Sequence, residues 1–311
     1  MENPSPMSEH RRSIPRTVTP LEVPALVGTG MLRFPLKQQA LDALVRSALD
    51  EDGAFNDLTT IATVVSERRG RGKLTARESG VICGVALALN AFRHLDPKVA
   101  IRVDVEDGMP VETGTSVLFL NGCARALLSA ERVALNFLQK LSGIASITAE
   151  FVRAVKGTGA KILDTRKTTP GWRLLEKYAV RAGGGTNHRM DLASAVLIKD
   201  NHLAAVDGDI VLAVRRAREL APGVQVEVEC DTIEQVQCAV DAGADVIMLD
   251  NMSLDQLRTS VQLVNRRATL EASGGVNLGT VRAIAETGVD WISVGALTHS
   301  APSMDLALDF D

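Results

Sequence analysis

A stretch of basic residues in the middle of the chain is the densest group of side chains that could do chemistry. Between residues 161 and 200 the basic residues are Lys161, Arg166, Lys167, Arg173, Lys177, Arg181, Arg189 and Lys199, and the acidic residues are Asp164, Glu176, Asp191 and Asp200. Eight cations against four acids give this span a charge of +4, inside a chain whose formal net charge is −4. Because arginine forks bind carboxylate and phosphate groups through paired hydrogen bonds, the span predicts a strongly anionic ligand.

These cations fall into two groups. Four of them flank the ends of predicted strands and are assigned to the ligand: Arg166, Lys167, Arg189 and Lys199. For Arg173, Lys177 and Arg181 we favour a solvated face of a helix.

A glycine-rich turn near the C-terminus is a candidate phosphate cradle. EASGGVNLGTV (271–281) reads as a strand, a Ser-Gly-Gly turn and a helix that begins near Asn277. Backbone N–H groups at such turns and the helix dipole together bind phosphate, and SVGAL (293–297) supplies a further glycine one strand later. We expect the phosphate at Ser273, Gly274, Gly275, Val294, Gly295 and Ala296, with a plain tight turn as the alternative.

Two acids, Glu229 and Asp250, end neighbouring predicted strands. Carboxylates in such a pair can hold Mg²⁺, bind sugar hydroxyls or stabilise a developing cation. Ion-pairing or helix-capping acids are the alternative. Glu227 shares the strand parity of Glu229, so alternation does not choose between them, and nearness to the strand end favours Glu229.

The elements that must position these groups form a repeat of strands and helices after residue 160. Strands are predicted at 161–165, 195–200, 224–230, 245–251, 268–273 and 290–297, and helices at 207–220, 232–243, 253–267 and 277–287. This alternation implies parallel strands joined by right-handed crossovers. Nearly every strand ends in chemically capable groups, and a barrel brings all its carboxyl strand ends to one rim. We therefore predict an α/β barrel and not a doubly wound sheet.

The first half of the chain has a different pattern. A helix is predicted over 36–53, short alternating strands at 72–85, 99–111 and 115–125, a helix-like segment at 85–94 and a long helix at 129–157. We consider a break in that long helix at Ser142–Gly143. Residues 1–35 are rich in proline and lack periodicity, so we expect a flexible extension there.

Composition excludes several classes of protein. The chain has 311 residues, 46% hydrophobic and 23% charged, which is typical of one large or two modest globular domains. Its net negative charge and its 3% aromatic content argue against nucleic-acid binding. We expect neither a membrane-spanning stretch nor a secretory leader, and therefore no membrane and a cytoplasmic location. The four cysteines lack metal-ligand spacing, so we expect free thiols.

Taken together, these residues predict a site for a phosphorylated sugar, a polyphosphate accompanied by Mg²⁺ and an anionic co-substrate. The sequence has no Cys/His pair, no GxSxG motif and no Schiff-base lysine that outranks phosphate binding. Such a site suits a reaction that depends on positioning and charge.

Several motifs resemble the quinolinate phosphoribosyltransferase family from about Leu36 to the C-terminus. The most specific is DTRKTTPGWRLLEKYAVRAGGGTNHRMDLASAVLIKDNH (164–202), and it is accompanied by EDGAFNDLTT (51–60), ERVALNFLQKLSGIAS (131–146), DVIMLDN (245–251), EASGGVN (271–277) and SVGALTHSAP (293–302). Asp191 and Ser194 depart from the family pattern, as does the residue before Asp57, but no charged site residue is missing.

The resemblance implies a chemistry and roles for the site residues. Quinolinate would attack phosphoribosyl pyrophosphate, with Mg²⁺ as cofactor, and lose CO₂ to give nicotinate mononucleotide for NAD synthesis. The two carboxylates would be bound by Arg166, His188, Arg189 and Arg132, and Thr165 would also bind substrate. Lys167 and Lys199 would meet carboxylate or pyrophosphate. Lys167, Lys199, Glu229 and Asp250 would be catalytic, with Glu229 and Asp250 binding ribose or Mg²⁺, and the glycines would seat the 5′-phosphate. Arg132 would come from the second subunit of a homodimer.

The resemblance also implies an architecture. An N-terminal α/β sandwich over residues 36–145, completed by about 298–311, would precede an incomplete, atypical α/β barrel over 146–297. Two alternatives remain open: a nicotinate phosphoribosyltransferase, which would need fewer cations, and a non-catalytic metabolite-binding paralogue, which would be expected to have lost its rim acids or lysines.

Overall fold

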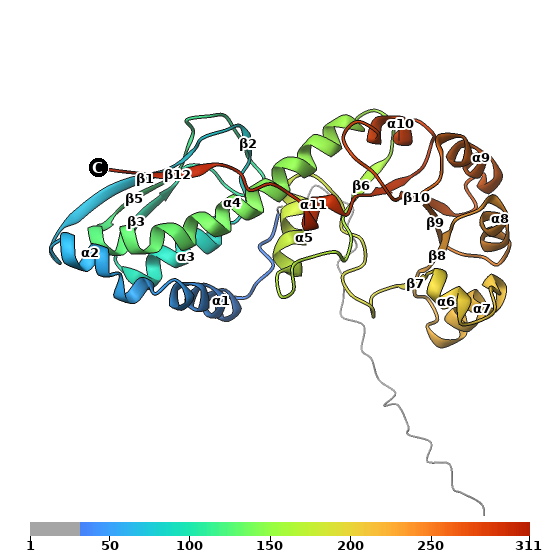
Figure 1. Cartoon of the computed structure of the whole chain (residues 1–311), viewed down its shortest axis with the longest axis horizontal. Coiled ribbons are helices and arrows are strands. Elements are labelled where there is room, and N and C mark those ends of the chain that lie inside the picture. Colours follow the sequence, from blue (N-terminus) through green and yellow to red (C-terminus); the bar gives the residue numbers. More distant parts are fainter. Residues whose placement is uncertain (1–31) are drawn as a thin grey trace, which may run out of the picture.

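The computed structural model describes residues 32–311, and residues 1–31 of the predicted extension lie outside the described residues. Within them, two sheets lie at opposite ends of one long helix, α4 (Ala124–Ala154) (Figure 1). The prediction of a flexible extension to residue 35 is wrong for Leu32 and Phe34, which pack against the core. The Phe34 ring meets the Tyr178 ring edge to face, with the centroids 5.4 Å apart.

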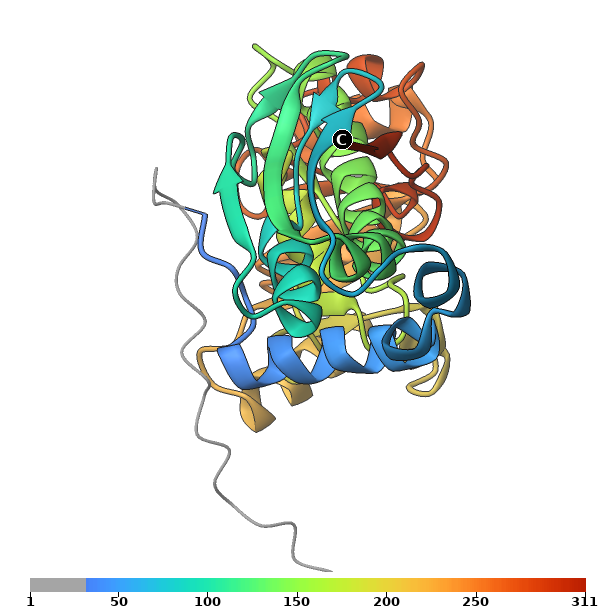
Figure 2. The same cartoon turned by 90° about the vertical axis from the view of Figure 1, so that its left-hand side faces the viewer.

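The first region is a sheet covered by helices on one face (Figures 1 and 2). Its strands, in the order β12-β1-β5-β3, are β12 (Leu306–Phe310), β1 (Arg69–Ala76), β5 (Ser116–Cys123) and β3 (Ala100–Val103), all antiparallel to their neighbours. The helices are α1 (Gln38–Glu51), the short η1 (Ala54–Asn56), α2 (Leu58–Thr63) and α3 (Val85–Leu95). Two short strands, β2 (Gly80–Val81) and β4 (Pro110–Val111), pair with each other in a separate antiparallel sheet. Alternate residues are buried over 69–74 of β1 and 118–123 of β5, as a sheet with one covered face requires. Pairing of β12 with β1 returns the C-terminal segment to this sheet.

The second region is an open barrel of six parallel strands. Their order is β6 (Lys161–Leu163), β11 (Trp291–Ser293), β10 (Thr269–Ser273), β9 (Val246–Asp250), β8 (Val226–Cys230) and β7 (Val196–Ile198). The helices that follow these strands in the chain are α5 (Arg173–Ala182), α6 (Asp200–Ala204), α7 (Ile210–Leu220), α8 (Ile233–Asp241), α9 (Leu254–Val264), α10 (Val281–Ala285) and α11 (Ala296–His299). Consecutive residues of β9 are buried, because a parallel sheet is covered on both faces. The sheet does not close between β6 and β7, so the predicted incomplete α/β barrel is confirmed.

Helix α4 is continuous, so a break at Ser142–Gly143 is wrong. Both small residues serve contacts instead. The Ser142 hydroxyl accepts the amide of Cys83 at 2.9 Å, and a Cβ on Gly143 would lie 1.9 Å from the carbonyl oxygen of Pro302. The helix also starts at Ala124, five residues before its predicted start.

The helix predicted to begin near Asn277 begins at Val281. Asn277 forms a turn before it, since its carbonyl accepts the amides of Thr280 and Val281 and its side chain accepts that of Gly279. The dipole of a helix at Asn277 therefore does not contribute to the phosphate cradle as the sequence suggested.

Candidate active site

A cavity of about 840 Å³ opens at the carboxyl ends of the barrel strands. Its lining contains every predicted site residue but one: Thr165, Arg166, Lys167, His188, Arg189, Lys199, Glu229, Asp250, Ser273, Gly274, Gly275, Val294, Gly295 and Ala296. Parallel strands explain this convergence, because their carboxyl ends meet at one rim. The exception is Arg132, which is exposed on α4 and outside the cavity lining.

Glycines shape one end of the cavity. Gly274 and Gly275 have φ angles of 93° and 61°, which side chains rarely allow. A Cβ on Gly274 would lie 2.2 Å from Oδ1 of Asn251. The amides of Gly274, Gly275 and Gly295 donate to no backbone carbonyl within residues 32–311, so they remain available to an anion.

The cationic end lies at the edge of the sheet, around β6. The Nε atom of Arg166 is buried and has no hydrogen-bond partner in the described part of the chain. Arg189 donates Nη1 to the carbonyl of Ala195 at 2.9 Å, and burial together with the nearby Arg166 guanidinium lowers its pKa. Two guanidinium groups that repel each other here would be stabilised by a multiply charged anion.

The acids lie between these two ends. Glu229 forms an ion pair with Lys199 from the neighbouring strand, and Asp250 accepts the side-chain amide of Asn251 at 2.7 Å. Both carboxylates face the cavity. Oxygen donors at an open rim fit a hydrated Mg²⁺, which prefers one or two carboxylates together with substrate phosphates.

A buried cluster of His188, Glu227 and Glu271 lies in the wall beside the cationic end. Nε2 of His188 lies 3.1 Å from Glu227 Oε2 and 3.5 Å from Glu271 Oε2, and the two carboxylates are 3% and 0% exposed. Nδ1 accepts the amide of Arg189 at 2.7 Å. Nε2 lies within ion-pair distance of both carboxylates but makes no hydrogen bond in the described part of the chain, and the ring lines the cavity.

The cluster holds one proton more than its separated groups would at neutral pH. Burial opposes the charged imidazole, but Glu227 and Glu271 outweigh it and raise the pKa of His188 to about 10. Burial and Glu271 also raise the pKa of Glu227. Because Nδ1 accepts a hydrogen bond, the ring keeps its single proton on Nε2, and the additional proton belongs to the carboxylates of Glu227 and Glu271.

This arrangement also argues against a metal ion in the cluster. The ligand atoms of His188, Glu227 and Glu271 lie within 4.8 Å of one another, close enough to share an ion. A neutral imidazole carries one proton, however, and an accepting Nδ1 leaves it on Nε2. Glu271 is not among the residues predicted from the sequence, and the one sequence signal for Glu227 is its shared strand parity with Glu229.

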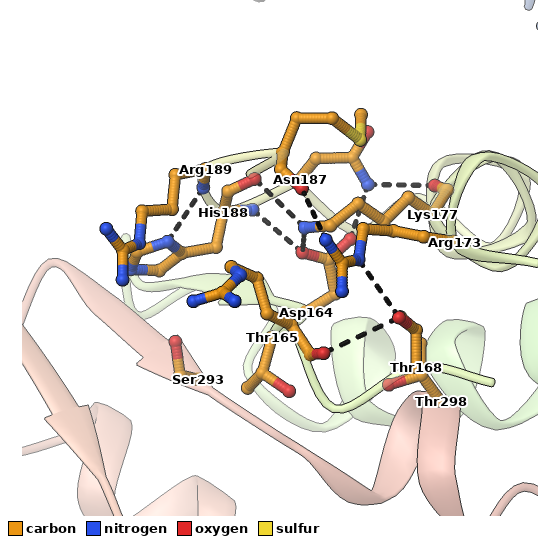
Figure 3. Close-up of polar contacts among 12 residues, drawn as sticks. Asp164, Thr165, Thr168, Arg173, Lys177, Asn187, His188, Arg189, Ser293 and Thr298 are labelled. Carbon is orange, nitrogen blue, oxygen red and sulfur yellow. Dashed lines mark hydrogen bonds and ion pairs between the residues drawn. The ribbon is translucent and has the colours of Figure 1, made fainter. Parts of the chain in front are cut away.

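The prediction that Lys177 lies on a solvated face of a helix is wrong. Its side chain and that of Asp164 are both fully buried, and the two form an ion pair (Figure 3). The burial has a local cause, since α5 packs against α4 and turns this position inward. Arg173 is also engaged, donating to the Thr168 hydroxyl at 3.0 Å and to the Met190 carbonyl at 3.3 Å.

Family models match nearly the whole described chain. The C-terminal domain of quinolinate phosphoribosyl transferase matches residues 144–309, and the N-terminal domain of the same family matches residues 57–142. The chain belongs to the quinolinate phosphoribosyltransferase family. The resemblance that the motifs suggested is thereby confirmed.

Individual members of the quinolinate phosphoribosyltransferase family agree along most of the chain. The nicotinate-nucleotide pyrophosphorylase [carboxylating] of Mycobacterium leprae is 46% identical over 271 residues, covering 85% of this chain and 95% of that protein. Its probable counterpart in Bacillus subtilis is 45% identical over 260 residues, covering 83% and 89%. A crystal structure of NadC from Streptococcus pyogenes has a TM-score of 0.85 at 41% identity, covering 89% of this chain and 98% of that one.

Human nicotinic acid phosphoribosyltransferase shares the fold alone, with a TM-score of 0.53 at 11% identity. In residues 32–311, no helix is both long and apolar enough to cross a membrane.

Proposed function

We propose that the protein is a decarboxylating quinolinate phosphoribosyltransferase. It transfers the phosphoribosyl group of phosphoribosyl pyrophosphate to the ring nitrogen of quinolinate and releases pyrophosphate and CO₂. The product is nicotinate mononucleotide, a precursor of NAD. The observation that carries this proposal is one cavity that has guanidinium groups at one end, unpaired glycine amides at the other and carboxylates between them.

The cationic end binds the pyridine dicarboxylate. Arg166 and Arg189 are directed to its two carboxylates, and Thr165 and Lys167 follow β6 on the same side of the cavity. Guanidinium forks orient a planar carboxylate, which holds the ring nitrogen toward the middle of the cavity. His188 lines the cavity at this end, with Nδ1 accepting the amide of Arg189 and Nε2 beside the carboxylate of Glu227.

The glycine end binds the 5′-phosphate of the second substrate. With this phosphate at Gly274, Gly275 and Gly295, the ribose spans the cavity toward Glu229 and Asp250. These carboxylates bind ribose hydroxyls and stabilise the positive charge that develops at C1′ as its bond to pyrophosphate breaks. Lys199 and Lys167 neutralise the departing anion.

Glu229 and Asp250 are also the residues that would hold Mg²⁺. The ion would enter with the pyrophosphate and neutralise part of its charge.

Loss of CO₂ follows from the first step. Once the ring nitrogen carries the ribose it is cationic, so the electron pair left at C2 when the carbon–carbon bond breaks is stabilised beside it. A proton then takes the place of CO₂ at C2. The protein has to orient the ring and leave the departing carboxylate free to lose its charge.

We further propose a cytoplasmic homodimer in which Arg132 completes the site of the partner subunit. Exposure of Arg132 on α4, away from the cavity of its own chain, supports this placement.

A direct assay tests the reaction. Purified protein is mixed with phosphoribosyl pyrophosphate, Mg²⁺ and either quinolinate or nicotinate, and nicotinate mononucleotide and CO₂ are followed. Equimolar product and CO₂ from quinolinate, with no turnover of nicotinate, is the expected result. Turnover of nicotinate would favour the monocarboxylate enzyme, and binding of quinolinate without turnover would favour the non-catalytic paralogue.

A further inference from the structure

Lys177 and Asp164 form the centre of a buried polar cluster under the cationic end of the cavity (Figure 3). Lys177 comes from α5, and Asp164 follows β6 directly. Neither side chain has any exposed surface, so neither can touch a ligand. A third member, Asn187, reaches both, since its side-chain amide donates to the Asp164 carboxylate and, at 2.8 Å, to the carbonyl of Lys177.

This cluster holds both peptide groups of His188. The Asp164 carboxylate accepts the amide of His188 at 2.9 Å, and the ammonium of Lys177 donates to its carbonyl at 3.0 Å. In Figure 3 these bonds converge on one turn of chain, with the Arg189 side chain extending away from it. The peptide plane on each side of His188 is therefore set by a charged group.

Outside this cluster, the segment that carries His188 and Arg189 is held by scattered contacts, such as that of Arg173 with the Met190 carbonyl. It lies outside the helices and strands, and its one bridge to the sheet joins Leu163 and Thr186. Asp164 also precedes Thr165 and Arg166 in the chain. One carboxylate thus ties together the two segments whose guanidinium groups enter the cavity, those of Arg166 and Arg189.

A contribution to folding stability does not explain why Asp164 and Lys177 are charged residues at these buried positions. Burial lowers the pKa of Lys177 against the opposing effect of Asp164, and the nearby Arg173 and Arg166 disfavour a third cation further. An apolar pair of similar volume would stabilise a buried site as well or better. An apolar pair, however, could not hold the amide and the carbonyl of His188.

We propose that Asp164, Lys177 and Asn187 are positioning residues that aim Arg166 and Arg189 at a planar dicarboxylate by fixing the peptide groups of His188. The identity of that ligand, quinolinate, rests on the proposed function.

The test measures binding, using the full chain and isothermal calorimetry. Asn187→Ala removes two hydrogen bonds and leaves the buried ion pair intact, so this variant is expected to fold. Its Kd for quinolinate should rise about tenfold, since the carboxylate that holds the amide of His188 loses one of its own hydrogen bonds. Its Kd for phosphoribosyl pyrophosphate, whose 5′-phosphate is directed to the glycine end, should stay within about twofold.

Asp245→Asn is the matched control. Asp245 also pairs with a cation, Arg218, and accepts a backbone amide, that of Val226, but at the amino end of its strand. Binding of both ligands should be unchanged in it. An equal weakening of both ligands in Asn187→Ala, or a lower Tm with unchanged binding of both, would overturn the proposal.

A double variant, Asp164→Asn with Lys177→Met, removes the buried charges together and leaves no unpaired ion. It should weaken quinolinate binding at least as much as Asn187→Ala does, and unchanged binding in a folded double variant would contradict the positioning role. Wild-type protein that binds quinolinate without turnover would refute the proposed reaction but leave this test intact. Wild-type protein that does not bind quinolinate would refute both.

Discussion

The two ends of the cavity prepare a surface for anions in different ways. At the glycine end, the backbone itself supplies the donors, and the φ angles of Gly274 and Gly275 turn their amides away from the chain. At the cationic end, the donors are long side chains on segments outside the strands, and they depend on the buried pair of Asp164 and Lys177 below them. The first end is built from local conformation, and the second from contacts between distant segments.

This difference has consequences for how each end can be damaged. The glycine end tolerates little change of shape but contains no charge that could be lost. The cationic end loses binding when a guanidinium is removed, and also when a residue that never meets the ligand is changed. Substitutions at the cationic end should therefore weaken the binding of quinolinate. Substitutions at the glycine end should weaken the binding of phosphoribosyl pyrophosphate.

Removal of a guanidinium at the cationic end should have the largest effect. In Arg166→Ala, kcat/KM for quinolinate should fall about 1,000-fold, because truncating one partner of a desolvated charge pair typically costs about 2–5 kcal/mol. Binding of phosphoribosyl pyrophosphate alone should change little. Steady-state kinetics for quinolinate and calorimetry for the other substrate separate these effects.

The control is Arg258→Ala on α9, where an exposed arginine pairs with Asp255 and lies outside the cavity lining. Its activity should stay within about twofold of wild type.

Mixing inactive Arg166→Ala with inactive Arg132→Ala should restore about one quarter of wild-type activity, because half the dimers would then contain one intact site. No recovery after subunit exchange would mean that Arg132 acts within its own chain or not at all.

A methyl group at the glycine end should give the next largest effect, on the other substrate. In Gly274→Ala the added Cβ would lie 2.2 Å from Asn251 Oδ1, on a backbone with φ of 93°. We expect the KM for phosphoribosyl pyrophosphate to rise about 100-fold, as misplacement of a binding group by about 1 Å can produce. Quinolinate binding measured alone should be nearly unchanged.

Gly157→Ala is the control that separates the effect of backbone strain at a positive φ angle from the effect of a changed shape at the glycine end. Gly157 has a similar φ of 87°, but no atom lies within 4 Å of an added Cβ. This variant should lose some stability and keep both binding constants. If Gly274→Ala weakens both substrates equally, the division of the cavity into two ends is wrong.

The same contrast explains what the sequence could predict. The rim was predictable because strand periodicity and parallel connections place the strand ends together, so fourteen predicted residues line one cavity. Gly274 and Gly275 were predictable because their role depends on their own backbone. Burial of Lys177 was not, since its partner lies thirteen residues away on another element and a lysine in a helical pattern usually faces solvent.

Tertiary contacts account for the other differences. Ser142 and Gly143 look like helix breakers in isolation, whereas in the fold they accommodate the segments of Cys83 and Pro302. The cluster of His188, Glu227 and Glu271 joins three segments that share no local pattern. Alternation placed Glu227 on the same face as Glu229 but could not show that one would be buried and the other would line the cavity.

That cluster gives the smallest effect, and it concerns stability. The pKa of His188 is raised to about 10, whereas an unfolded histidine titrates near 6.5. The stabilisation is therefore fully present below about pH 6.5 and is lost as the pH rises through 10. Over that window one extra bound proton should reduce the free energy of unfolding by up to about 1.4 kcal/mol per pH unit.

Glu227→Gln should flatten this dependence. The amide keeps the shape of the side chain but cannot share the proton, so His188 keeps Glu271 as its only carboxylate partner in the cluster. Urea unfolding at pH 7.5 and pH 9.5 gives the loss of stability for each protein, and the loss should be smaller in the variant. Other groups titrate in this window too, but they are common to both proteins and cancel in the difference. Equal losses would mean that the extra proton does not reside in this cluster, and that its carboxylates are ionised beside a neutral imidazole.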